Sequence, residues 1–222
     1  EPGQGDRRGQ EDAGRPGGVI RTACVSGALL AAALLAGCAT LPQSKSPPCE
    51  TVPGPAITLS ADGRTASTRL DVLTYNIEGL GWPARRGRAA ELSEIGRRLA
   101  ELRASGKGPD VILFQEVFSR PAVAAVEATG YPAVAAGPGR RHRRDLPGAG
   151  APPGRRAWMR GELGFKLASS GLAIASRYPI LEHEGEPFGR RGCAGLDCLS
   201  NKGALFARVA IPGAPAPVDV FN

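Results

Sequence analysis

Two short apolar strings, each carrying one polar side chain near its C-terminal end, constrain this chain more than any other feature. They are Leu73–Ile77 and Asp110–Val117, and their apolar character predicts two buried β-strands. Asn76 belongs to the first string and Glu116 to the second. A carboxylate is a hard oxygen ligand that suits Mg²⁺ or Ca²⁺, and an amide beside it can orient a phosphate oxygen or a metal-bound water. Asn76 and Glu116 are therefore candidate site residues.

The order of the other predicted elements favours a mixed sheet with outer helices. Apolar side chains recur at helical spacing in residues 89–104, and a proline in the first turn behind Ser119 favours a short helix over residues 121–129. We expect a central strand at residues 70–77, buried on both faces, and further strands at 111–115, 171–176, 204–211 and 218–221. Strand–helix–strand alternation followed by strand-rich sequence is typical of this layered class.

Two later segments extend the pattern, namely Gly171–Ile180 and the tripeptide Asn201-Lys202-Gly203. With the two strings they resemble the endonuclease/exonuclease/phosphatase superfamily, which are metal-dependent phosphoesterases with the pancreatic deoxyribonuclease fold. The resemblance runs from Leu70 to Asn222. It implies an α+β fold, a four-layered α/β/β/α sandwich of two mixed β-sheets. It also implies Mg²⁺, or another divalent cation such as Mn²⁺ or Ca²⁺, as cofactor.

The same resemblance assigns roles to individual residues. Glu116 and Asn76 are expected to be catalytic and to bind the metal, and Asn201 and Lys202 to bind substrate. Asn222 aligns with the asparagine of the family's Asn-Thr-His and is a further catalytic candidate. The alternatives are a solvated glutamate at a strand end, a turn-forming asparagine and an ordinary lysine at a strand entry.

The catalytic histidine of the family has no counterpart in a matching motif. The histidines of the chain are His142 and His183, and neither lies in a family segment. A domain of this superfamily is expected to have about 250 residues, within the range of single α/β domains. We therefore predict that the chain is the N-terminal part of such a domain, truncated at its C-terminal end, without the general base and acid, and inactive by itself.

The first forty residues predict export. Arg21 precedes the apolar run Ala23–Ala36, which is shorter than the about 20 residues that span a bilayer. The run leads to Cys38 in a segment that resembles a bacterial lipobox, so residues 19–37 are expected to be a lipoprotein signal and Cys38 to be lipidated. Residues 1–18 do not fit a signal and are expected to be an upstream extension. The alternative is a small Ala/Leu core helix.

The remaining chain divides by composition. Residues 38–67 are rich in Pro, Ser and Thr and predict a tether, whereas residues 68–222 hold the domain. A lipid anchor would attach the protein to a membrane of the bacterial cell envelope, on the outer-membrane or periplasmic side, with secretion as the alternative. No obligate protein partner is evident.

An exported protein meets an oxidising compartment, which bears on its cysteines. Cys193 and Cys198 are close enough in sequence to close a small disulfide loop. The alternative is a metal pair, although the sequence offers no second Cys/His pair to complete a zinc site. Cys49 is left over, and Cys24 would leave with the signal.

The net charge of +7 is concentrated in one segment. Residues 140–160 hold seven arginines and one aspartate, and they are also rich in Pro and Gly, which predicts a loop. A basic loop attracts DNA, anionic lipid or lipopolysaccharide. The alternative is a solvated surface insertion.

Residues 195–203 indicate which of the possible substrates is favoured. They resemble the Asp-x-Leu-x-Asn-Lys-Gly segment of bacterial sphingomyelinase-type phosphodiesterases. We therefore expect a divalent-metal-dependent phosphodiester hydrolase, with a phospholipid of the sphingomyelin type as substrate. The alternatives are an exported nuclease with a nucleic-acid substrate, and a non-catalytic envelope lipoprotein that uses the fold as a binding module.

Overall fold

The computed structural model describes residues 41, 53–81, 85–143, 159, 162, 165–188 and 192–222. The predicted signal peptide and Cys38 lie outside these residues, as does most of the arginine-rich segment. Within the described parts of the chain, every helix is too short or too polar to cross a membrane.

A four-stranded mixed sheet forms the centre of the domain, in the order β3-β4-β6-β5. Strand β3 (Val72–Asn76) runs parallel to β4 (Val111–Gln115), and β6 (Ala173–Ser176) runs antiparallel to both β4 and β5 (Ala133–Ala136). The continuous apolar run of β4 suits a strand that is covered on both faces, and its residues are mostly buried.

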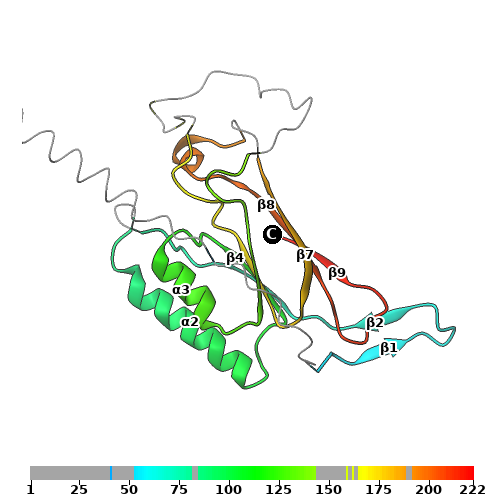
Figure 1. The fold of residues 1–222 in the computed structure, drawn as a ribbon. Coiled ribbons are helices and arrows are strands. Elements are labelled where there is room, and N and C mark those ends of the chain that lie inside the picture. Colours follow the sequence, from blue (N-terminus) through cyan, green and yellow to red (C-terminus); the bar gives the residue numbers. More distant parts are fainter. Residues whose placement is uncertain are drawn as a thin grey trace, which may run out of the picture. The chain divides into compact units, whose positions relative to one another are not determined.

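Two helices cover one face of this sheet, α2 (Arg88–Ala104) and α3 (Arg120–Ala128) (Figure 1). They pack closely, since a Cβ atom on Gly96 would lie 2.7 Å from the carbonyl oxygen of Ala125. Ser119 caps α3 by accepting a hydrogen bond from the Ala122 amide. The core beneath the helices includes Leu92, Leu99, Ile112, Phe114, Val123 and Val126.

A three-stranded antiparallel sheet packs on the other face. It contains β7 (Ile180–Pro187), β8 (Gly203–Val209) and β9 (Val218–Phe221), in that order. Alternate side chains of β8 point inward and meet the first sheet in a second core, formed by Leu205, Ala207, Val209, Val111 and Ile174. The described residues therefore form three layers, which are the helices, the mixed sheet and the antiparallel sheet.

The tether prediction for residues 38–67 is wrong at its C-terminal end. Strands β1 (Ile57–Leu59) and β2 (Ala66–Thr68) pair there as a hairpin. A turn with Gly63 at φ 68° joins them, a conformation that glycine adopts without strain. The threonines that contributed to the linker-like composition also suit β-strands, because β-branched residues favour extended backbone.

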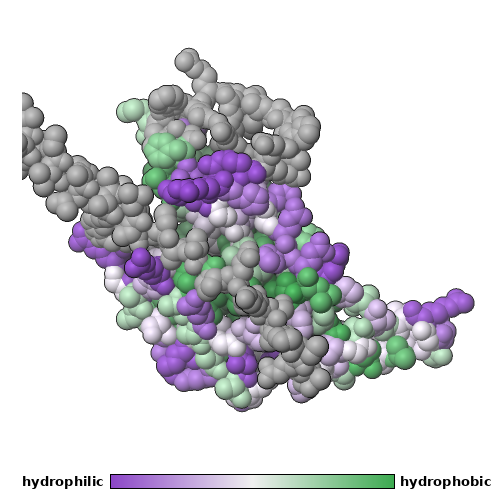
Figure 2. Space-filling view, viewed as in Figure 1, coloured by the Kyte–Doolittle hydropathy of each residue, from purple (hydrophilic) through white to green (hydrophobic). Residues whose placement is uncertain are grey.

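Strand β3 is not the doubly buried central strand that residues 70–77 predicted. Among the described strands it pairs only with β4, and Val72 is 50% exposed. Strands β5 and β7 are not evident from the sequence, because β5 is alanine-rich and β7 carries three glutamates and a histidine. The described surface is not uniformly polar: Figure 2 shows exposed hydrophobic residues (green) beside hydrophilic ones (purple). The large apolar side chains exposed in the structure include Leu59, Phe188, Leu196 and Phe221.

Candidate active site

The ends of β3 and β4 bring Asn76 and Glu116 together. Because these parallel strands are in register, Asn76 lies opposite Gln115, and Glu116 follows directly. The Nδ2 atom of Asn76 donates a hydrogen bond of 2.8 Å to Oε1 of Glu116. Two polar groups from distant parts of the sequence therefore meet at one edge of the sheet.

The backbone at this edge is unusual at two acidic residues. Glu116 has φ 60° and Glu78 has φ 47°, values that residues other than glycine rarely adopt. Asn76 links them, since its Oδ1 atom accepts a 2.9 Å hydrogen bond from the Glu78 amide. Strained backbone of this kind persists only where the surrounding structure holds it, and it is common at functional sites.

An open cleft of about 440 Å³ lies at this edge. It is lined by Asn76, Glu78, Leu80, Arg85 and Glu116, and Oε2 of Glu78 lies 3.7 Å from an Nη atom of Arg85. The sequence interpretation missed Glu78 and Arg85. The signal for Glu78 was available, since it lies two residues after Asn76 in the same segment.

The donor set is small but fits a hard divalent cation. The described residues contain no group of three or more His, Cys, Asp or Glu side chains placed to hold a metal. Mg²⁺, however, is usually held by one or two carboxylates together with waters and substrate phosphate oxygens. Glu116 and Glu78 line one cleft and meet that requirement. Both polar atoms of the Asn76 amide are already hydrogen-bonded, which favours an orienting role for Asn76 over the predicted ligand role.

Asn222 does not line the cleft. Its Oδ1 accepts a 2.7 Å hydrogen bond from Gln115, and its Nδ2 donates to the carbonyl oxygens of Phe114 (2.8 Å) and Ala173 (3.0 Å). The whole amide is therefore used within the protein. The structure gives no support to the catalytic role predicted for Asn222.

Asn201 and Lys202 are not among the residues that line the cleft. Asn201 is buried, and its Nδ2 donates to the carbonyl oxygens of Gly139 (2.8 Å) and His142 (3.0 Å), so its amide nitrogen anchors main chain. The Lys202 ammonium lies 3.4 Å from Asp197 and 5.8 Å from the centre of the Phe118 ring. Lys202 is outside the cleft lining, but Phe118 is two residues from Glu116.

A disulfide closes the loop that directly precedes these residues. Cys193 and Cys198 are bonded, with Cα atoms 5.0 Å apart, and Cys198 lies in the 3₁₀ helix η2 (Gly195–Leu199). A Cβ atom on Gly203 would lie 2.2 Å from the carbonyl oxygen of Glu186, so a side chain there would push β8 away from β7. Lys202 therefore lies in the chain between the disulfide loop and a close contact of β8 with β7.

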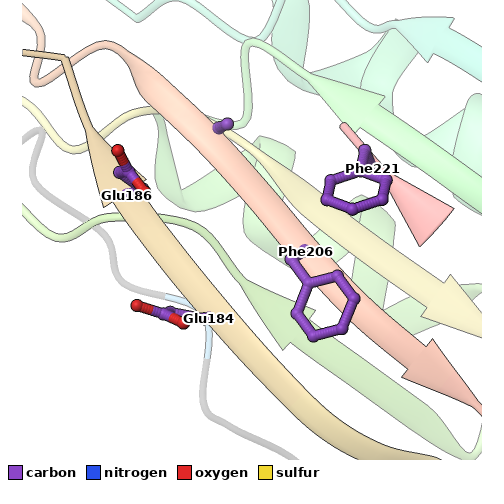
Figure 3. Close-up of a pocket in the computed structure, with 5 residues that line it drawn as sticks. Glu184, Glu186, Phe206 and Phe221 are labelled. Carbon is purple, nitrogen blue, oxygen red and sulfur yellow. The ribbon is translucent and has the colours of Figure 1, made fainter. Parts of the chain in front are cut away.

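A second hollow, of about 210 Å³, lies on the antiparallel sheet. Figure 3 shows its labelled residues, with Glu184 and Glu186 from β7, Phe206 from β8 and Phe221 from β9. The rings of Phe206 and Phe221 have their centres 5.3 Å apart. This hollow and the cleft have no lining residue in common.

Similar structures come from bacteria. A beta toxin of Staphylococcus aureus with bound magnesium ions is 22% identical, with a TM-score of 0.42, and the match covers 69% of this chain and 48% of the toxin. A sphingomyelinase C of Streptomyces griseocarneus is 22% identical, with a TM-score of 0.45 and coverage of 68% and 47%. An endonuclease/exonuclease/phosphatase family protein of Leptotrichia buccalis is 13% identical, with a TM-score of 0.38 and coverage of 69% and 53%. The chain spans about half the length of these proteins.

A search of the curated proteins finds no match. The sequence model of the endonuclease/exonuclease/phosphatase family matches residues 73–217. This range contains Asn76, the whole of β4, the disulfide loop and the whole of β8. The chain therefore belongs to the endonuclease/exonuclease/phosphatase family.

Proposed function

We propose that the protein is a divalent-metal-dependent phosphodiester hydrolase and that the Asn76–Glu116 pair is the centre of its metal site. The observation that carries the proposal is the 2.8 Å hydrogen bond between these side chains, at the ends of adjacent parallel strands and in an open cleft. Membership of the family supports the reaction class.

Each residue of the cleft receives a role in this proposal. Glu116 is the carboxylate ligand, Asn76 orients it, and Glu78 is a second carboxylate within the same cleft. Arg85, which pairs with Glu78, would bind a phosphate oxygen of the substrate. A bound Mg²⁺ would neutralise phosphate charge and favour attack by water. Lys202 would add positive charge beside Phe118.

We propose a phospholipid of the sphingomyelin type as the substrate. The resemblance of residues 195–203 to the segment of bacterial sphingomyelinase-type phosphodiesterases supports this choice. A lipidated Cys38 would add to it, because acyl chains hold an enzyme beside its lipid substrate. The protein would then be a lipoprotein of the bacterial cell envelope, with residues 19–37 as its signal.

We also propose that the complete domain is a four-layered α/β/β/α sandwich. The three layers of the described residues supply the first three parts of that order. The open face of the antiparallel sheet, which carries Phe206 and Phe221, is where a fourth layer would pack.

The substrate is tested on the complete domain, because the 222 residues by themselves are expected to be inactive. Sphingomyelin vesicles and plasmid DNA are supplied side by side, with Mg²⁺, to the complete domain and to its Glu116→Gln variant. We expect the complete domain to release phosphocholine from vesicles and to leave the plasmid intact, and Glu116→Gln to be inactive. Cleavage of the plasmid alone would favour the exported nuclease. Binding of vesicles without turnover of either substrate would favour the non-catalytic binding module.

A further inference from the structure

Glu116 holds a backbone conformation that it would not adopt by itself. Its φ of 60° is rare for residues other than glycine, and strain of this kind must be held by its neighbours. The main chain beside it is fixed on both sides, since the Val117 amide donates to Gly171 O at 2.8 Å and Ile77 donates to Gln115 O at 3.2 Å. These bonds fix the flanking peptide groups.

The side chain of Gln115 adds a further restraint directly before Glu116. Its Nε2 atom has two hydrogens and lies within hydrogen-bond distance of three acceptors, which are Asn222 Oδ1 at 2.7 Å, Leu113 O at 3.0 Å and Thr74 Oγ1 at 3.2 Å. The Thr74 contact reaches β3 and the Asn222 contact reaches the end of β9. Gln115 therefore ties three strands together one residue before the proposed metal ligand.

Asn222 is fixed in turn by both its side chain and its main chain. Its Nδ2 donates to Phe114 O and Ala173 O, on β4 and β6 of the mixed sheet. Its backbone amide and carbonyl each form a 2.8 Å hydrogen bond with Leu205 of β8. Asn222 therefore connects the two sheets through hydrogen bonds, and its Oδ1 atom also accepts a hydrogen bond from Gln115.

We infer that Gln115 and Asn222 are positioning residues that hold Glu116 at its positive φ and so preorganise its carboxylate for a divalent cation. Neither side chain lines the cleft, and both act through the residue between them and the metal. The part of this inference that concerns the metal rests on the proposed function, whereas the part that concerns the Glu116 backbone does not. Hydrogen bonds that orient a metal ligand typically contribute about 10–100-fold to metal affinity.

The experiment uses the full 222-residue chain with Gln115→Met, which keeps the length of the side chain, and Asn222→Ala. Tyr131→Phe is the matched control, because it removes another hydrogen bond of the interior, from Tyr131 to Pro109 O near the opposite end of β4. Two readouts are taken for each protein. The amide–Hα coupling constant of residue 116 reports its φ by NMR, and a calorimetric titration with Mn²⁺ alone reports metal affinity.

We expect Gln115→Met and Asn222→Ala to shift the coupling constant of Glu116 and to weaken Mn²⁺ binding about tenfold or more. Tyr131→Phe should leave both unchanged even if it lowers stability. An unchanged coupling constant in both variants would overturn the inference. If the wild-type chain binds no Mn²⁺, the proposed function fails, and the coupling constants still decide the positioning role.

Discussion

Strand β4 carries a carboxylate just beyond each end, and the two are used in opposite ways. Asp110, directly before the strand, has a side chain that is only 13% exposed. It accepts hydrogen bonds from the Tyr178 hydroxyl at 3.1 Å and the Asp71 amide at 3.0 Å, and Arg177 Nε lies 3.5 Å away. Burying a charge is costly unless it is paired, and Asp110 is paired from three sides.

Glu116, directly after the strand, lines an open cleft. Its side chain accepts one hydrogen bond from Asn76, its backbone is at φ 60°, and no described cationic side chain forms an ion pair with it. A carboxylate that the protein has satisfied stabilises the fold. A carboxylate held in place but left open to the cleft is available to a ligand. The comparison separates a structural acid from a functional one on the same strand.

The largest expected loss of stability follows substitution of Asp110. Asp110→Ala should destabilise the chain by about 3–5 kcal/mol, because it removes the acceptor of the hydrogen bonds from Tyr178 and Asp71, and each hydrogen bond to a charged group contributes about 1.5–3 kcal/mol. The midpoint of urea unfolding measures this loss. The control Asp62→Ala removes an exposed carboxylate in the β1–β2 turn and should barely move the midpoint. An equal loss of stability in Asp110→Ala and Asp62→Ala would show that Asp110 is not a structural acid.

Substitution of Glu116, at the other end of β4, should weaken metal binding and leave the stability of the fold unchanged. Glu116→Gln keeps the acceptor for Asn76 but removes the charge, so Mn²⁺ affinity should fall by more than the about 10–100-fold that an outer-shell partner contributes. Isothermal titration measures this. Glu182→Gln is the matched control on β7, where the carboxylate pairs with Arg208, and should leave the affinity unchanged. An equal loss of Mn²⁺ affinity in both variants would contradict the assignment of Glu116 as a metal ligand.

A smaller effect is expected at Tyr178. Burial, followed by the charge and hydrogen bond of Asp110, raises the pKa of Tyr178 from its ordinary 10.0 to about 12. A raised folded-state pKa contributes stability that is complete below pH 10 and is lost as the pH rises toward 12. Tyr178→Phe should cost about 1.5–3 kcal/mol at neutral pH, the range for a hydrogen bond to a charged group.

Urea unfolding of wild type and Tyr178→Phe from pH 7 to 12 measures this dependence. The difference in stability between the two proteins should narrow above pH 10 as the wild type loses its advantage. A difference that stays constant over that window would show that Tyr178 does not titrate as described.

The smallest expected effect is a gain in stability. Glu116→Gly should relieve the left-handed backbone, which costs other residues about 1–2 kcal/mol, less the entropy cost of glycine, for a net gain of about 1 kcal/mol or less. The same variant should lose Mn²⁺ binding. Thermal unfolding and metal titration on one sample check both. A destabilised variant would mean that the Glu116 side chain supports the fold, as Asp110 does.

Much of the fold that surrounds the site follows from sequence pattern. Residues 111–115 were predicted as a strand because the apolar run is continuous, and β4 has these bounds. A helix was predicted after Ser119, and Ser119 caps α3 by accepting a hydrogen bond from the Ala122 amide. Strand β5 was not predicted, because alanine has little intrinsic preference for strands and its pairing with β6 decides the conformation.

The site, like the fold, could be predicted from the sequence only in part. Asn76 and Glu116 were both predicted because each lies near the C-terminal end of an apolar run, and the structure joins them by a hydrogen bond. The sequence could not separate them from Asn222, which resembles a site residue in the motif but whose amide is bonded to Gln115 and Phe114 through the packing of two sheets. It also missed Arg85, since the pairing of Arg85 with Glu78 depends on how the loop after β3 folds.

The most direct test of the account is a Mn²⁺ titration of the chain followed by NMR, because the paramagnetic ion broadens the signals of the groups nearest to it. The account predicts that Asn76, Glu78 and Glu116 broaden first, at amounts of Mn²⁺ well below one equivalent, while Asp110 and Tyr178 stay sharp. Broadening that begins at Asp110, or that is spread evenly over exposed acids such as Glu94 and Glu182, would contradict it.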